Sequence, residues 1–159
     1  MAATPQRKTR VCFVASSGGH LLQLVHLAEA LDRSDRDELW VSFETRDAVS
    51  LLRNKSCVWA FAPTNRNLVN LIRNFRLAFQ VLRHFRATAV VSTGAGVAVP
   101  FVYAARLLGI TTIFIESFSR ITEPSLTARL VRPVATHVFV QWPELRDLLP
   151  GSQYEGAIF

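Results

Sequence analysis

Short apolar segments alternate with helical patterns along most of this chain, and no other feature constrains the fold as strongly. The apolar segments have the length of buried strands, and the segments between them repeat apolar residues at helical spacing. We predict strands over 10–16, 39–43, 58–61, 89–92, 112–115 and 138–141, and helices over 21–32, 48–53, 67–85, 97–108 and 125–131. This order predicts an α/β fold built on a doubly wound, mostly parallel sheet.

The length and composition fit one domain. The chain has 159 residues, half of them hydrophobic, so it can bury a substantial core. We expect a single domain over 1–159, with residues 1–9 flexible. The uncharged stretch from Ala87 to Ala105 has the length of a membrane span, but its glycines divide it into a strand and a helix start. Cys12 and Cys57 lie in strand-like segments without metal-ligand spacing, which indicates buried, reduced thiols.

Three distinctive loops follow predicted strands, namely Ser16–His20, Ser92–Gly96 and Glu116–Arg120. The carboxyl ends of parallel strands share one edge of the sheet, where ligands of such folds bind. In the first loop, Gly18 and Gly19 allow close approach to the main chain, and the start of the following helix favours an anion. The loop therefore indicates a phosphate cradle, with an ordinary strand-to-helix turn as the alternative.

Basic residues dominate the middle of the chain. The net charge is +6, and no acidic residue lies between Asp47 and Glu116, so anionic partners are favoured. The helix over 67–85 combines arginines with large apolar residues, which is typical of helices at a membrane surface. A helix packed on the sheet with a solvated arginine edge is the alternative. The candidate membrane contacts are Leu68, Leu71, Arg73, Phe75, Arg76, Phe79 and Arg83.

Nucleic acid is the rival partner for a basic chain. We find no recognition motif, few lysines and no aromatic residues interleaved with the arginines as a stacking platform. We therefore expect no nucleic-acid partner.

Five motifs occur in order along the chain. They are Ser-Ser-Gly-Gly-His20, the basic and apolar helix, Val-Ser-Thr-Gly-Ala-Gly-Val-Ala-Val-Pro100, Ile-Glu116-Ser-Phe-Ser-Arg120 and Val-Phe-Val-Gln-Trp-Pro-Glu144. Together they resemble the accessory-subunit family of split glycosyltransferases. That family provides the membrane-anchoring subunit of the eukaryotic dolichol-diphosphate N-acetylglucosamine transferase and one half of bacterial capsule and exopolysaccharide transferases. More distantly, the chain is similar to the N-terminal domain of MurG.

The resemblance implies a Rossmann-like domain, the N-terminal half of a GT-B glycosyltransferase, that serves the acceptor side of an inverting reaction. A separate donor-domain subunit would form a heterodimer with it and bind most of the UDP-sugar. No cofactor is expected in this chain and no metal ion is required. The acceptor would be a polyprenyl-diphosphate-linked sugar at the cytoplasmic face of a membrane. We expect peripheral attachment and the bacterial branch, with glucuronic acid, galactose, glucose or N-acetylglucosamine as the transferred sugar.

The apolar end of the sequence is a candidate docking strip for that partner, through Tyr154, Ile158 and Phe159. In a single-chain relative the sequence would continue here into the donor domain. A last strand placed on the sheet is the alternative.

The motif match assigns candidate roles to individual residues. Glu116 is the preferred general base or ligand of the acceptor hydroxyl, and His20 is the other candidate base. The candidate diphosphate ligands are Ser16, Ser17, Gly18, Gly19, Thr93, Gly94, Gly96 and Arg120. Structural alternatives are a salt bridge from Glu116 to Arg120 or a helix cap, a helix-start role for His20, and a tight turn at Thr93–Gly96.

The chain departs from the MurG pattern in two respects, because its glycine loop is less glycine-rich and Ile115 precedes Glu116 where MurG has histidine. A noncatalytic phosphate- or nucleotide-binding module that recruits a partner to membranes is the alternative function.

Overall fold

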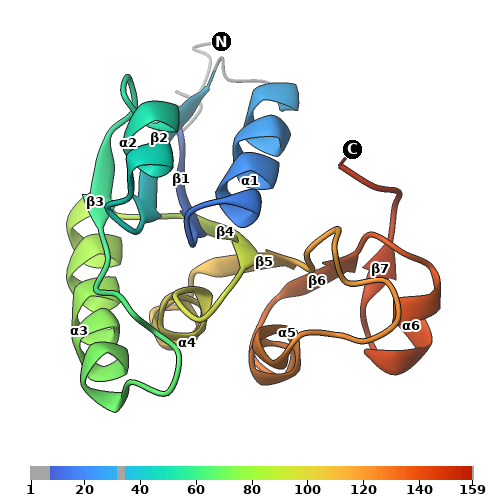
Figure 1. Ribbon diagram of the computed structural model, residues 1–159. Helices are drawn as coiled ribbons and strands as arrows, with labels where there is room; N and C mark the ends of the chain where they lie inside the picture. Colours follow the sequence, from blue (N-terminus) through green and yellow to red (C-terminus); the bar gives the residue numbers. More distant parts are fainter. Residues whose placement is uncertain (1–7, 32–34, 159) are drawn as a thin grey trace, which may run out of the picture.

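A computed structural model describes residues 8–31 and 35–158, which form one seven-stranded sheet with helices on both faces (Figure 1). The strands are β1 (Thr9–Ala15), β2 (Arg36–Ser42), β3 (Cys57–Trp59), β4 (Ala89–Gly94), β5 (Thr111–Ile115), β6 (His137–Val140) and β7 (Gln153–Tyr154). The helices are α1 (Gly19–Ala30), α2 (Arg46–Leu51), α3 (Leu68–Phe85), α4 (Ala98–Leu107), α5 (Leu126–Val131) and α6 (Glu144–Leu148). Thr9 already belongs to β1, and residues 1–7 of the expected flexible segment lie outside the described residues.

The sheet has the strand order β3-β2-β1-β4-β5-β6-β7, and every pair of neighbouring strands is parallel. The predicted doubly wound sheet is therefore confirmed. Strands β2 and β3 are added in turn on one side of β1. The chain then crosses to the other side of β1, where β4 to β7 are added in turn. The strand order thus reverses between β1 and β4. In sheets of this kind, ligands bind in the crevice beyond the carboxyl ends of the strands at such a point, and we use the word crevice for this position.

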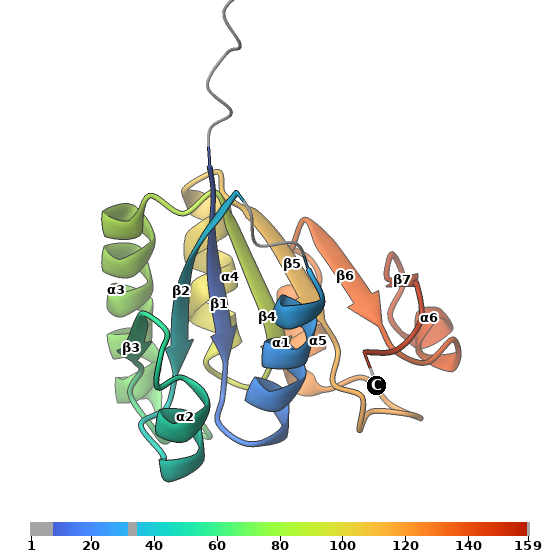
Figure 2. The same ribbon diagram turned by 90° about the horizontal axis from the view of Figure 1, so that it is seen from above.

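Helices α1 and α2 cover one face of the sheet, while α3, α4 and α5 cover the other (Figures 1 and 2). Because both faces are covered, Val11–Ala15 of β1 is buried throughout. Phe13 stacks on Trp40 at 4.5 Å between ring centroids on the α1 face. Cys12 points into the core on the α3 face, where burial raises the pKa of its thiol to about 12. Cys12 is thus a packing residue, as expected.

The uncharged stretch that has the length of a membrane span forms β4 and α4. Among the described residues, no helix combines the length and the apolar character that crossing a bilayer requires.

Two asparagines decide which side of α3 faces the protein. Asn74 is fully buried, and its side-chain amide donates to the Phe61 carbonyl and accepts from the Phe61 N–H, both at 2.9 Å. Asn70 donates from its side chain to the Pro63 carbonyl at 2.9 Å. The β3–α3 loop is therefore tied to the buried side of the helix. Leu71, Phe75 and Phe79, expected on the membrane-contacting face, are half-buried instead.

We predict that Asn74→Leu destabilises the fold. The variant keeps most of the buried volume but leaves both backbone groups of Phe61 without their partner, so the free energy of unfolding should fall by about 1–3 kcal/mol. Urea denaturation measures this change. The exposed Gln80, on the same helix, supplies the control Gln80→Leu, which should change stability by less than about 0.5 kcal/mol. Equal stability of the two variants would contradict the assignment.

Candidate functional site

The imidazole of His20 stands at the crevice between β1 and β4. Its Nδ1 lies 2.8 Å from the Thr93 carbonyl oxygen, and the Thr93 hydroxyl donates to the His20 carbonyl at 2.6 Å. A carbonyl oxygen only accepts, so Nδ1 carries the proton of this hydrogen bond and Nε2 keeps its lone pair in the neutral ring. The ring is half-buried at the start of α1. His20 is thus fixed in the tautomer that accepts a proton at Nε2.

Gly94 leaves the space that this ring occupies. A Cβ at position 94 would lie 3.4 Å from both Nδ1 and Cε1 of His20, and the backbone φ of +112° also favours glycine. At Gly96, a Cβ would lie only 2.7 Å from the Thr64 hydroxyl oxygen. Both glycines therefore allow close packing of neighbouring groups. A role as phosphate ligands for Thr93, Gly94 and Gly96 stays a prediction.

The amide of Gly18 already has an anionic partner. Its N–H donates at 2.7 Å to the carboxylate of Asp47, at the start of α2, which follows β2 on the side of β1 away from β4. Hydrogen bonds from the side chain of Thr45 and the amide of Gly18 lower the pKa of the exposed Asp47 carboxyl. The expected diphosphate cradle thus loses Gly18 as a donor, because Asp47 occupies its N–H. The first-turn amides of α1, which include Gly19, have no partner within the helix and remain candidates.

Glu116 is buried at the end of β5, with only 1% of its surface exposed. One carboxylate oxygen accepts the Ser117 N–H at 2.9 Å, and the other accepts the Ser125 N–H at 2.7 Å. Ser125 in turn caps α5 through its hydroxyl. The salt bridge to Arg120 that we considered is not formed in the described part of the chain. Glu116 instead closes the loop that runs from β5 to α5, which is the arrangement of a positioning residue.

Two glutamines hold the same loop. Neither was a candidate site residue, although Gln141 stands in the fifth motif. The Gln141 side chain donates to the Gln23 side-chain oxygen and to the Glu116 carbonyl, both at 2.9 Å. Gln23, on α1, accepts the Phe118 N–H at 3.1 Å. Trp142 adds a bond from its indole N–H to the Phe118 carbonyl at 2.7 Å. A signal was present in the sequence, because Gln23 is a lone amide within an apolar helical repeat.

The remaining polar candidates lie on the loops that follow β1 and β5. Ser16 and Ser17 are half-buried in the β1–α1 loop, and Arg120 is exposed on the Glu116–Arg120 loop. Among the described residues, no three histidine, cysteine, aspartate or glutamate side chains lie close enough together to hold a metal ion.

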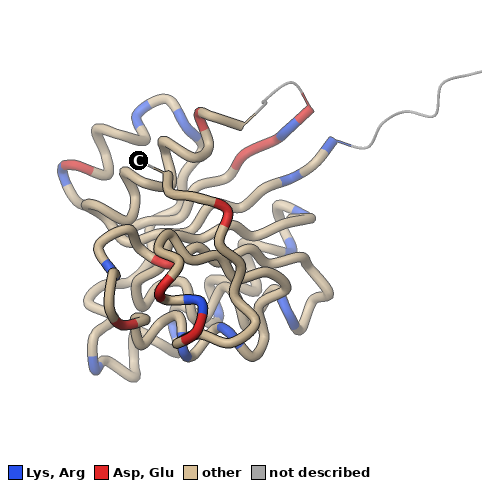
Figure 3. The backbone as a smooth tube through the Cα atoms, turned by 90° about the vertical axis from the view of Figure 1, so that its right-hand side faces the viewer, with Lys and Arg blue, Asp and Glu red and all other residues tan. Residues whose placement is uncertain are grey.

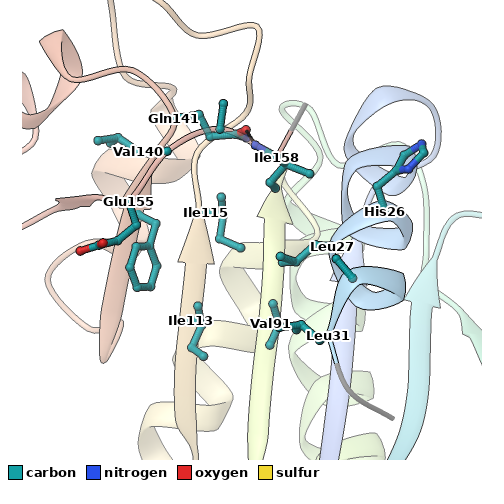
Figure 4. Close-up of a pocket in the computed structure, with 14 residues that line it drawn as sticks. His26, Leu27, Leu31, Val91, Ile113, Ile115, Val140, Gln141, Glu155 and Ile158 are labelled. Carbon is teal, nitrogen blue, oxygen red and sulfur yellow. Dashed lines mark hydrogen bonds between the residues drawn. The ribbon is translucent and has the colours of Figure 1, made fainter.

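The C-terminal tail crosses the open part of the sheet beside α1. Its Ile158 N–H donates to the Gln141 side-chain oxygen at 2.9 Å, so Gln141 joins the tail to the loop (Figure 4). The tail, α1 and the strands border an open apolar cavity of about 430 Å³. Tyr154 pairs with β6 as part of β7, as in the last-strand alternative, and 42% of its surface is exposed. Phe159 lies outside the described residues.

The exposed apolar residues of α3 gather at its first two turns. Leu68, Val69 and Ile72 have 73%, 59% and 66% of their surface exposed. Arg73, Arg76 and Arg83 are exposed along the same helix. These six residues form what we call the α3 surface, which differs from the predicted set by Val69 and Ile72 in place of Leu71, Phe75 and Phe79.

Comparison with known proteins shows to which family this chain belongs. The profile of the family described as "Oligosaccharide biosynthesis protein Alg14 like" matches residues 60–158. The chain belongs to this family. It is 25% identical over 190 residues to the human UDP-N-acetylglucosamine transferase subunit ALG14, covering 99% of this chain and 87% of that protein.

Two MurG-type relatives extend the comparison. The N-acetylglucosamine transferase of Prochlorococcus marinus that acts on pyrophosphoryl-undecaprenol is 30% identical over 148 residues, which cover 87% of this chain and 41% of the enzyme. The crystal structure of Acinetobacter baumannii MurG superposes with a TM-score of 0.77 at 22% identity, covering 94% of this chain and 45% of that protein. The chain thus spans just under half the length of MurG, and the GT-B N-terminal-type fold is confirmed.

The expected membership in the accessory-subunit family is confirmed, and with it the class of glycosyltransferase subunits. The finer expectation of a bacterial capsule or exopolysaccharide branch is not borne out. The human relative named above is a subunit of a UDP-N-acetylglucosamine transferase, and the family description refers to oligosaccharide biosynthesis.

We predict that Gln141→Leu loosens two distant segments together. The variant keeps the side-chain volume but removes the bonds to Gln23, the Glu116 carbonyl and the Ile158 N–H, so hydrogen exchange should become faster in both 116–120 and 154–158. Mass spectrometry of exchanged peptides measures this. Gln153→Leu, on the exposed strand β7, is the matched control and should leave residues 116–120 unchanged. Faster exchange confined to one segment would show that Gln141 does not couple them.

Proposed function

We propose that this chain is the acceptor-binding and membrane-contacting subunit of a two-subunit inverting glycosyltransferase. It acts with a donor-domain subunit that binds most of the UDP-sugar, and the acceptor is a polyprenyl-diphosphate-linked sugar. The names of the relatives favour N-acetylglucosamine over the other sugars considered above. The single observation that carries the proposal is the imidazole of His20, held by Thr93 at the crevice of a GT-B N-terminal-type domain.

His20 is the general base in this proposal. The acceptor hydroxyl oxygen attacks the anomeric carbon of the donor sugar and forms the new glycosidic bond. The bond from that carbon to the diphosphate breaks, and UDP leaves with the electron pair. The hydroxyl proton passes to Nε2 of His20, whose Nδ1–H is oriented by the Thr93 carbonyl. The acceptor diphosphate lies against the first-turn amides of α1 and near Arg120, whose guanidinium matches phosphate geometry.

Glu116 supports the reaction without accepting the proton. Both of its carboxylate oxygens already receive backbone N–H groups, and its side chain is buried beneath the loop. We therefore propose that Glu116 positions Ser117 to Arg120 against the acceptor. This proposal revises the preference for Glu116 as the base.

Kinetic measurements on the reconstituted pair of subunits distinguish the role of His20 as the base from the positioning role of Glu116. We expect His20→Ala to lower kcat by about 10²–10⁴-fold with assembly intact. Glu116→Gln places an amide NH₂ against a backbone N–H, so we expect a higher KM for the acceptor and a smaller loss of kcat. His137→Ala, at the opposite edge of the sheet, is the control for His20.

Two results would overturn these assignments. Loss of turnover in Glu116→Gln, with stability and acceptor KM unchanged, would make Glu116 the base. Full turnover in both variants would favour the noncatalytic recruiting module.

The α3 surface is the proposed membrane contact. Leu68, Val69 and Ile72 offer apolar area, and the arginines beside them attract anionic headgroups. No acidic residue lies between Asp47 and Glu116, an interval that contains α3 and α4 with their arginines. Figure 3 marks the basic residues of the chain in blue and the acidic residues in red. This charge pattern favours peripheral attachment to an anionic membrane surface.

Reversing the charge of Arg73, Arg76 and Arg83 to glutamate should release the chain from anionic vesicles. Each basic group near such a surface contributes about 1 kcal/mol, so we expect a loss of partitioning of about 100-fold or more. Co-sedimentation with vesicles measures it. Reversal of Arg46, Arg53 and Arg146, which lie away from α3, changes the net charge equally and should have a much smaller effect. Equal release by both triple variants would make the attraction a property of net charge alone.

The partner subunit is proposed to dock at the C-terminal end of the chain. Ile158 borders the apolar cavity between α1 and the tail, and Tyr154 offers an exposed ring on the edge strand. Exposed apolar area at the edge of a sheet is typical of surfaces that bind another protein chain.

A further inference from the structure

Helix α5 and the loop that leads to it expose a second group of large apolar side chains. Ile121, Leu126 and Leu130 have 50%, 72% and 43% of their surface exposed. The membrane contact proposed for α3 does not use them. Leu126 and Leu130 lie one turn apart on α5 and so share a face of the helix, and exposed apolar patches of this kind are a feature of interaction sites. We call these three residues the α5 surface.

The α5 surface is joined to α3 through α4. The ring of Phe75 on α3 meets the ring of Tyr103 on α4 edge to face, with centroids 6.4 Å apart. The Tyr103 hydroxyl then donates to the Leu130 carbonyl of α5 at 3.0 Å. The three helices lie in one layer on the same face of the sheet (Figure 1). A row of aromatic and aliphatic groups therefore runs from α3 to α5 across Tyr103.

Basic residues also accompany the α5 surface. Arg120 precedes Ile121 in the chain, and Arg129 is exposed on α5 between Leu126 and Leu130, whereas the Arg132 side chain is bonded to the Pro150 carbonyl. Glu123 is the single acidic residue between Glu116 and Glu144. Exposed aliphatic groups flanked by arginines suit the interface of an anionic bilayer, where the apolar side chains enter the acyl boundary and the guanidinium groups meet phosphates.

The α5 surface directly follows the loop of the candidate site in the sequence. Ile121 directly follows Arg120, and Glu116 binds the N–H of Ser125 immediately before Leu126. A lipid-linked acceptor whose diphosphate lies at this loop has its polyprenyl chain within reach of Ile121 and Leu126. The loop therefore connects the proposed diphosphate site to the apolar surface.

We infer that the α5 surface is a second membrane contact, which rests on an anionic bilayer together with the α3 surface. Two separated contacts fix the rotation of the domain on the membrane, whereas α3 alone would leave the domain able to turn about that helix. The inference rests on the membrane contact proposed above and adds the residues, Leu126 foremost, that set the orientation of the site.

The depth of individual residues in the bilayer tests the inference. In the full-length chain with Cys57→Ala, single cysteines at Leu126, Leu68 or Leu22 carry an environment-sensitive fluorophore, while the buried Cys12 resists labelling. The chain binds vesicles of phosphatidylcholine and phosphatidylglycerol with or without a lipid-borne quencher. Leu22 is the matched control, because it is 40% exposed on α1, on the opposite face of the sheet. We expect lipid quenching at positions 68 and 126 to exceed that at position 22 by severalfold.

The possible outcomes distinguish a failure of the α5 contact from a failure of the α3 membrane contact. Quenching at position 68 with position 126 behaving like position 22 would overturn the α5 contact and leave the α3 contact standing. Quenching at neither position would overturn both. Protection of position 126 by the added donor subunit, without lipid quenching, would assign the α5 surface to a protein interface and overturn the inference.

A binding measurement supplies a second, independent result. Leu126→Ser with Leu130→Ser should weaken partitioning into the same vesicles by roughly tenfold or more, because two leucines lose their apolar contact with lipid. Leu22→Ser should leave partitioning unchanged. Unchanged partitioning of the double variant would contradict the inference even where both variants fold normally.

Discussion

The buried side-chain amide of Gln141 is the interaction on which the candidate site depends. An amide group inside a protein must find partners for its N–H and C=O groups, because leaving one unpaired costs free energy. Gln141 satisfies this requirement with groups from three separate parts of the chain, which are α1, the end of β5 and the C-terminal tail. One side chain therefore fixes the relative positions of the helix that carries His20, the loop that follows Glu116, and the tail that borders the proposed docking cavity.

Much of the fold was predictable from the sequence because its elements are long enough to show a period. The buried strands and the helices α1, α3 and α4 repeat apolar residues clearly, and parallel topology alone brings the three loops to one edge. Helix α6 was not predicted and strand β7 was predicted only as an alternative, since five and two residues are too few to establish a period. The apolar face of α3 packs on the sheet as in the alternative with a solvated arginine edge, but the polar residues on that face were not predicted, for another reason. Asn70 and Asn74 are polar, and their burial depends on backbone groups of a loop whose position the sequence does not reveal.

The candidate site was predictable in composition but not in detail. Glycines, a histidine and a glutamate after strands were sufficient to locate it. The direction of each side chain depends on contacts between residues far apart in sequence. Asp47 reaches Gly18 across 29 positions, and Gln141 reaches Gln23 across 118. The Thr93 carbonyl, 73 positions from His20, gives the imidazole a defined tautomer. The N–H groups of Ser117 and Ser125 on the Glu116 carboxylate are the reason that we propose a positioning role for Glu116.

The contact between Asp47 and Gly18 has a consequence for the order of the glycine loop. A helix start concentrates positive potential, and in many proteins the loop beside it becomes ordered only when a ligand supplies negative charge. Here the carboxylate of Asp47, from the chain itself, supplies that charge to the Gly18 N–H, so this contact forms without a ligand. A diphosphate on the neighbouring first-turn amides would meet a turn that already has this bond, so less ordering of the backbone would oppose its binding.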